Sequence, residues 1–141
     1  IEEYLNEYKG IKNFMNNIVE VAKEKGYVET LYKRRRYVPE IKSNNYVVRQ
    51  FGTRVAMNTP IQGTAADIMK IAMIDVYKKL KENNLKTKIV LQVHDELILE
   101  CPVEEKEIAK KLLKNCMENV IKLKVPLKAE VSEGYSWYEL K

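Results

Sequence analysis

Apolar residues recur at intervals of three and four in several stretches of the chain, which is the spacing of one face of an α-helix. This spacing predicts four helices, over residues 10–25, 44–57, 60–80 and 104–123. Gly26 is the expected end of the first helix and Pro126 of the last. Thr59, Pro60 and Gln62 match a helix N-terminus, with a capping residue, a proline at the first helical position and a glutamine that can bond back to the cap. We therefore predict separate helices before and after Thr59.

A β-hairpin is the sharpest local feature. Residues 86–93 and 97–101 are rich in leucine and β-branched residues, and only His94, Asp95 and Glu96 separate them. So short a gap predicts a tight reversal between antiparallel strands. Along the first strand, successive side chains are expected to alternate strictly between the two faces.

Other stretches complete an α+β fold. Residues 27–39 indicate a short strand pair or an extended loop, and the alternation in 127–131 predicts a last strand.

The 141 residues fit one domain, and no apolar run approaches the ~20 residues of a membrane span. We therefore expect a soluble protein without a membrane partner. Because the chain begins with Ile, in sequence that indicates a helix, we expect a piece of a longer protein or a processed product.

The two cysteines, Cys101 and Cys116, lie in apolar sequence without metal-type spacing. They are expected to be buried thiols in a reducing compartment, which argues against disulfide scaffolds and zinc modules.

Positive charge is concentrated in one segment. The net charge is +5, and residues 31–54 hold seven cations against one carboxylate. Four of these cations are consecutive, from Lys33 through Arg34 and Arg35 to Arg36, between two tyrosines. Such a run suits a phosphate backbone, so nucleic acid is the first partner to consider. A solvated turn is the alternative that the charges alone leave open.

His94, Asp95 and Glu96 are the candidate chemistry at the hairpin tip. A carboxylate held by rigid strands and open to solvent suits Mg²⁺, which binds one or two carboxylates together with substrate phosphates. The alternative is an ordinary turn, because Asp is a common turn former and the histidine could bond a nearby backbone group.

Two longer strings carry a family resemblance. Residues 91–97, LQVHDEL, and residues 57–68, MNTPIQGTAADI, resemble the A-family DNA polymerases, the bacterial DNA polymerase I group. Residues 26–37 and the ending from Val125 to Tyr138 fit the same family in the same order, so the resemblance covers essentially the whole chain. It implies an antiparallel palm sheet with a central hairpin at about 86–101, backed by long helices and preceded by helices from the end of the fingers. Residues 1–57 would then be the end of the fingers and its connection to the palm, and residues 58–141 the palm.

The resemblance also implies roles for individual residues. Asp95 matches a metal-binding aspartate of two-metal phosphoryl transfer, and His94 and Glu96 flank it near the primer terminus. Arg54, Asn58 and Gln62 match residues beside the primer–template duplex, where donors meet minor-groove acceptors that every correct base pair presents. For Gln62, a purely structural bond to the cap at Thr59 is the competing interpretation.

The family's second metal-binding carboxylate and its triphosphate-binding helix lie earlier than Ile1 in a full-length enzyme. The chain alone is therefore not expected to polymerise DNA. The expected partners of the parent, a monomeric enzyme of replication or repair, are primer–template DNA, deoxynucleoside triphosphates and two Mg²⁺ ions. We expect a cytoplasmic location in a bacterial-type cell, with an organelle as the alternative.

Lys33 stands where the family pattern has glycine, which disfavours a tight turn with positive φ at that position.

Two other functions remain open from the sequence. One is a noncatalytic nucleic-acid-binding module that uses the 31–54 segment. The other is a metal-dependent phosphohydrolase built on His94, Asp95 and Glu96.

Overall fold

The structure, a computed structural model, describes residues 2–140. Contacts divide the chain into two compact units, the first ending at Asp67 and the second beginning at Ile68. Each unit is an arrangement of helices with one two-stranded antiparallel sheet, so the predicted α+β class is confirmed. No helix within residues 2–140 has both the length and the apolar character to cross a membrane.

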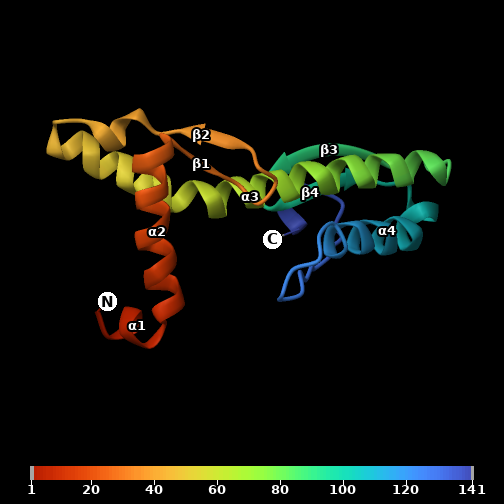
Figure 1. Cartoon of the computed structure of the whole chain (residues 1–141). Helices are drawn as coiled ribbons and strands as arrows, with labels where there is room; N and C mark the ends of the chain where they lie inside the picture. Colours follow the sequence, from red (N-terminus) through yellow and green to blue (C-terminus); the bar gives the residue numbers. More distant parts are fainter. Residues whose placement is uncertain (1, 141) are drawn as a thin grey trace. The chain divides into compact units, whose positions relative to one another are not determined.

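The first unit follows the predicted order of elements (Figure 1). Its elements are α1 (Glu2–Glu7), α2 (Lys9–Lys25), β1 (Tyr27–Glu29), β2 (Arg35–Tyr37), a 3-10 helix (Pro39–Lys42) and the first part of α3 (Tyr46–Glu82). Gly26 ends α2 with φ of 78°, and its N–H donates to the Ala22 carbonyl at 2.9 Å. The predicted first helix, its glycine stop and the strand pair are therefore confirmed.

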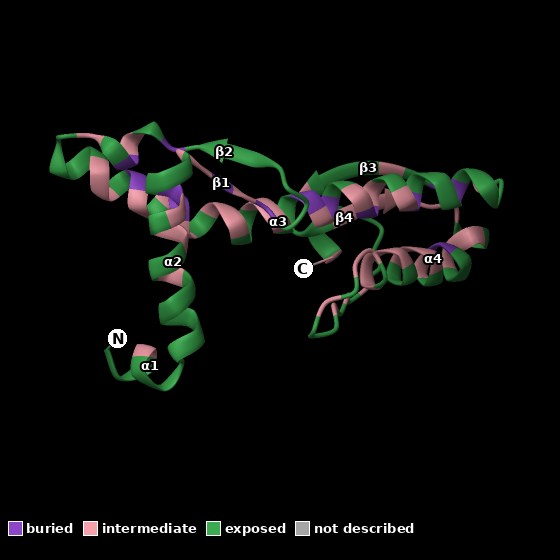
Figure 2. Cartoon of the chain, viewed as in Figure 1, coloured by how far each residue is buried: buried purple, intermediate pink, exposed green. Residues whose placement is uncertain are grey.

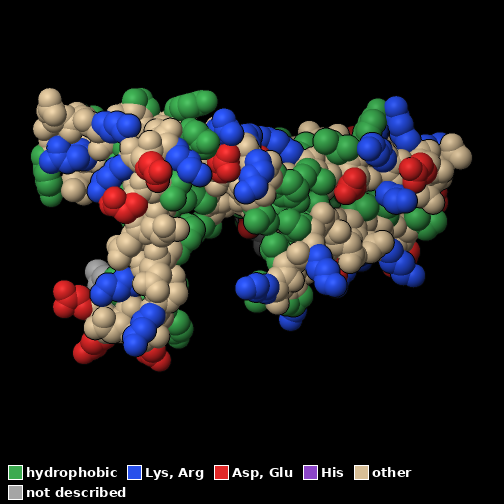
Figure 3. All heavy atoms as spheres, in the orientation of Figure 1, with side chains coloured by type: hydrophobic (Ala, Val, Ile, Leu, Met, Phe, Trp, Pro, Cys, Tyr) green, Lys and Arg blue, Asp and Glu red, His purple; other side chains and the backbone are tan. Residues whose placement is uncertain are grey.

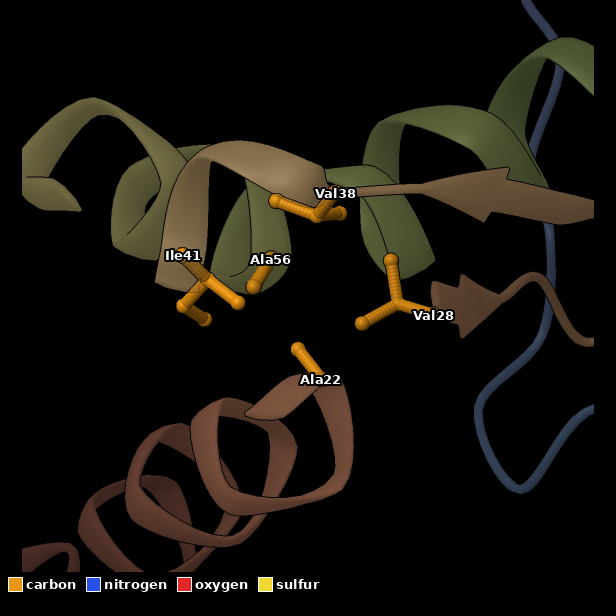
Figure 4. Packing of buried hydrophobic residues seen from close by; sticks show 5 residues of the cluster. All are labelled: Ala22, Val28, Val38, Ile41 and Ala56. Carbon is orange, nitrogen blue, oxygen red and sulfur yellow. The ribbon is translucent and has the colours of Figure 1, made fainter. Parts of the chain in front are cut away.

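Five small or β-branched side chains form the core of this unit. They point toward one another from α2, β1, the residue before the 3-10 helix, the 3-10 helix itself and α3, and they are Ala22, Val28, Val38, Ile41 and Ala56 (Figure 4). Figure 2 shows the same region as the buried part of the first unit. Gly52 lets α3 approach this core closely, since a Cβ on it would lie 2.6 Å from the Ile41 nitrogen.

Helix α3 is continuous across Pro60, so the predicted break at Thr59 is wrong. Proline removes the hydrogen bond to the Ala56 carbonyl and normally costs an interior helix ~3 kcal/mol. Here tertiary contacts hold both sides of the proline: Ala56 is buried in the core, and Gly63 and Thr64 contact the turn between β1 and β2. The local signal for a helix start is thereby overridden, and Thr59 caps nothing.

The expectation for Lys33, in the turn between β1 and β2, is wrong. The Lys33 N–H donates to the Thr30 carbonyl at 3.0 Å, and the φ angle of Lys33 is 65°. A tight turn with positive φ therefore forms despite the lysine. Because such a backbone favours glycine, Lys33 carries conformational strain.

Replacing Lys33 with glycine is expected to stabilise the chain by about 0.5–1 kcal/mol, because the left-handed strain of ~1–2 kcal/mol is only partly offset by the greater entropy of unfolded glycine. The ion pair that is lost, Lys33 Nζ to Glu29 at 3.9 Å, is exposed and contributes little. Urea unfolding would measure the change. Lys33→Ala keeps the strain and serves as control, so equal stabilisation by alanine would contradict this explanation.

The second unit is built on the predicted hairpin. After the end of α3 come β3 (Lys88–Val93), β4 (Glu96–Glu100), a 3-10 helix (Val103–Glu105), α4 (Lys106–Glu118) and a final 3-10 helix (Trp137–Leu140). The two strands pair antiparallel, as predicted. The predicted strict alternation is wrong, because Ile89 pairs with Leu99 and Leu91 with Ile98, which leaves Val90 as an extra residue. This bulge leaves Val90 and Leu91 52% and 38% exposed.

Two predictions near the carboxy terminus are also wrong. The last long helix ends at Glu118 rather than near Leu123. At this end the Asn115 carbonyl accepts from both the N–H and the side-chain amide of Asn119, at 3.1 and 2.9 Å, so Asn119 satisfies a terminal carbonyl of the helix as its C-cap. The predicted strand at 127–131 is irregular. Its Ala129 N–H donates to the Glu118 carboxylate at 3.0 Å instead of to a neighbouring strand.

Candidate functional site

The hairpin tip presents Asp95 on a two-residue turn. His94 and Asp95 make the reversal, and Glu96 already pairs with Val93 in the ladder. His94 has φ of 52°, in the left-handed region that favours glycine, and its carbonyl accepts a hydrogen bond from the Gln92 side chain at 2.6 Å. A side-chain amide thus bonds the carbonyl of a strained residue next to the candidate metal ligand.

The Asp95 carboxylate has the exposure that a metal ligand needs. Asp95 and Glu96 are both exposed, and no hydrogen bond or ion pair within the described residues engages the Asp95 side chain. A cavity of about 410 Å³ lies beside it, lined also by Lys128 and Trp137 from the tail. Carboxylate oxygens are the ligands that Mg²⁺ prefers, so the donor type fits this ion.

Throughout residues 2–140, no group of three or more His, Cys, Asp and Glu side chains could hold a metal ion. Asp95 therefore belongs to no such group among the described residues, and its role as a metal ligand stays a prediction.

A carboxylate in the 3-10 helix after the hairpin holds the residues just before β3, and no sequence pattern predicted it. Glu105 accepts hydrogen bonds from the Lys86 N–H, the Thr87 N–H and the Thr87 hydroxyl at 2.8, 2.9 and 2.6 Å. These bonds, led by that from Lys86, lower the pKa of the Glu105 carboxyl. The partners are 18 and 19 residues away, so no local pattern indicates the contact.

In the first unit, the three candidate duplex contacts share one face of α3. Arg54, Asn58 and Gln62 follow one another at intervals of four residues, and all are exposed. At 100° per residue, they lie about 160–240° round the helix from Ala56, which is buried in the core. Three side chains with hydrogen-bond donors thus form an open strip, which we call the α3 strip.

The three consecutive arginines occupy different environments. Arg34 Nε lies 2.7 Å from Asp67 Oδ1, and its Nη2 donates to the Gly63 carbonyl at 3.2 Å. Arg35 stacks on the Tyr27 ring at 4.5 Å and pairs with Glu29 at 3.0 Å, a bond that raises the pKa of its guanidinium. Strand alternation separates Arg35 from its neighbours.

Arg36 is exposed, and none of these ion pairs or ring contacts of the described residues involves it. Figure 3 shows Lys and Arg side chains gathered over the β1–β2 hairpin. That hairpin meets α3 on the face opposite the α3 strip, so the two predicted sets of DNA contacts do not share one surface. Contact of either set with DNA stays a prediction.

The cysteines are less buried than predicted. Cys101 and Cys116 are free thiols of intermediate exposure. Partial burial raises the pKa of the Cys116 thiol and so disfavours the reactive thiolate.

Comparison with known proteins identifies the family. The model of DNA polymerase family A matches residues 1–139. Over its full length the chain is 56% identical to DNA polymerase I of Caldicellulosiruptor bescii and 55% identical to that of Bacillus subtilis. It spans 17% and 16% of those proteins, about a sixth of their length.

A solved structure agrees. The polymerase domain of Pol1 from M. smegmatis, in complex with a DNA primer–template and dNTP, matches 99% of this chain with a TM-score of 0.95 and 41% identity. The chain covers 24% of that structure. By sequence and by fold, the chain belongs to DNA polymerase family A.

Proposed function

We propose that this chain is part of a DNA-directed DNA polymerase, which adds deoxynucleotides to a primer 3′-hydroxyl in replication or repair. The observation that carries the proposal is Asp95, an exposed carboxylate at the tip of a rigid hairpin in a chain of this family. Residues 1–57 would form the end of the fingers and residues 58–141 the palm. The half-buried free thiols suit a reducing, cytoplasmic location.

Primer–template DNA is the proposed partner of the α3 strip. Arg54, Asn58 and Gln62 carry exposed N–H donors, and the minor groove presents acceptors at the same positions for every correct base pair. Donors on one face of a helix would therefore sense the geometry of pairing without reading the sequence. His94 and Glu96 would flank the primer terminus on either side of Asp95 in the chain.

Mg²⁺ is the proposed cofactor, as two ions in the complete enzyme. When bound, such ions supply Lewis acidity toward the primer hydroxyl and the triphosphate. Asp95 would contribute one carboxylate to them. A second carboxylate would come from a part of the polymerase outside these 141 residues, as would groups that bind the incoming deoxynucleoside triphosphate.

The 141-residue chain is expected to show no primer extension at any Mg²⁺ concentration, whereas a longer polymerase that includes it extends a primer as the template directs. A gel-based extension assay with both proteins would measure this. Residual duplex binding by the short chain would weaken as salt rises. Template-directed extension by the short chain would refute its incompleteness, and failure of the longer protein to extend would refute the proposed function.

A further inference from the structure

The turn between β1 and β2 bonds α3 immediately after its proline. Three contacts join them: Arg34 Nε to Asp67 Oδ1 at 2.7 Å, Arg34 Nη2 to the Gly63 carbonyl at 3.2 Å, and the Leu31 N–H to Thr64 Oγ1 at 2.9 Å. The Thr64 hydroxyl also donates to the carbonyl of Pro60. The turn is therefore bonded to the first helical turns beyond the proline.

The fit at this contact is close as well as polar. A Cβ on Gly63 would lie 2.8 Å from Thr30 Cγ2 and 3.3 Å from Arg34 Nη2. Thr30 is only 3% exposed, and its hydroxyl accepts from the Arg34 N–H at 3.2 Å. The absence of a side chain at position 63 lets the turn lie directly on the helix.

This contact lies where α3 is intrinsically weakest. Pro60 cannot donate to the Ala56 carbonyl, so one hydrogen bond of the helix is missing between the residues on either side. In the α3 strip, Asn58 precedes the proline and Gln62 follows it. The direction of the Gln62 side chain relative to that of Asn58 therefore depends on a helical segment that lacks one backbone hydrogen bond.

We propose that Arg34 is a positioning residue: through Gly63 and Asp67 it braces α3 beyond Pro60, and so sets the direction of Gln62 relative to Asn58 and Arg54. The inference rests on the proposed contact of the α3 strip with the duplex. Arg34 acts from the opposite face of the helix and touches no DNA. Because its guanidinium is held by protein acceptors, it serves alignment rather than phosphate binding.

Arg34→Gln and Gly63→Ala test the brace in the longer polymerase that contains this chain. The first removes the ion pair, and the second displaces the turn without changing any charge. Arg49→Gln is the matched control, since Arg49 also bonds a backbone carbonyl, that of Ser43 at 2.8 Å, but near the start of α3. Each change is made in the wild-type protein and in Gln62→Ala, and kcat/KM for primer extension, its dependence on salt and the unfolding temperature are measured.

If Arg34 positions the strip, Arg34→Gln and Gly63→Ala each lower kcat/KM about tenfold in the wild-type background and less than about twofold in Gln62→Ala. The salt slope of DNA binding stays unchanged. The control shows no such coupling, even where its unfolding temperature falls equally. Arg34→Lys, which keeps the charge but cannot reproduce the fork of bonds, gives an intermediate loss and covers the case in which Arg34→Gln fails to fold.

Three results would overturn the proposal. Equal losses in both backgrounds would make Arg34 a purely structural residue. A salt slope reduced by about 0.9 would make it a phosphate contact. If Gln62→Ala itself leaves extension unchanged, the strip has no role in extension and the proposed duplex contact fails with the inference, whereas a loss in Gln62→Ala without coupling to Arg34 sinks the inference alone.

Discussion

Asp95→Asn in the complete polymerase is expected to lower kcat for nucleotide incorporation by about 10³-fold or more, while affinity for primer–template stays nearly unchanged. The carboxylate would be lost from the metal-binding centre, so the lost term is stabilisation of charge in the transition state rather than ground-state binding. Single-turnover extension measures the first quantity and a fluorescence titration of labelled duplex the second. The isosteric change leaves the exposed turn sterically unaltered.

Glu100→Gln provides the matched control for this change. Glu100 is an exposed carboxylate at the other end of the same hairpin, paired in register with Lys88. The Glu100→Gln substitution removes an equal charge from the same hairpin and is expected to leave the rate of nucleotide incorporation within about twofold of wild type. Near-normal turnover in Asp95→Asn would remove Asp95 from the metal-binding site.

Gln62→Glu in the complete polymerase is expected to reduce primer extension about 10²-fold without lowering the unfolding temperature. The substitution replaces a donor with a negative charge that faces the acceptors of the minor groove and leaves them unpaired. Because α3 is continuous across Pro60, Gln62 has no helix cap to support. The structural interpretation that competed with a duplex contact is thereby removed.

Gln50→Glu makes the same substitution on the same helix, one turn before Arg54 and at a position with no proposed duplex contact, so it serves as control for added negative charge beside the α3 strip. Extension from matched and mismatched primers should be compared in both variants. If Gln62→Glu extends both primers like the wild type, the duplex contact at position 62 is excluded. If both variants lose activity equally, added negative charge rather than a lost donor explains the effect.

The sequence predicted correctly those elements that are determined by neighbouring residues along the chain. The glycine that ends α2 and the apolar strands around Asp95 are decided by residues next to one another, and both were found. Pro60 looked like a helix start for equally local reasons, but packing at Ala56 and Gly63 decided otherwise. The strand predicted at 127–131 failed because a strand requires a neighbour, and its backbone found the Glu118 side chain instead.

In the candidate site, too, some residues could be predicted from sequence and others could not. Asp95 could be singled out because it lies with His94 and Glu96 between two apolar strands, in a string that resembles the family. The separate environments of Arg34, Arg35 and Arg36 could not be predicted from sequence, because the partner of each guanidinium depends on the fold. Arg34 pairs with Asp67, 33 positions further along the chain, whereas Arg35 stacks on Tyr27 across the strand pair. Consecutive charges therefore appeared as one patch when they serve separate contacts.

The close approach at Gly52 limits how this protein can be engineered. Replacing helical glycines with alanine is a common route to thermostability, worth roughly 0.5–1 kcal/mol at a permissive site. Gly10 in α2 is such a site, since an added Cβ would have no atom within 4 Å beyond its chain neighbours and the backbone of its own helix. At Gly52 the added methyl group would meet backbone atoms of Glu40 and Ile41 within 2.9 Å, and backbone cannot rotate away as a side chain can. A consensus or propensity-based redesign that treats the two glycines alike would thus lose at one position more than it gains at the other.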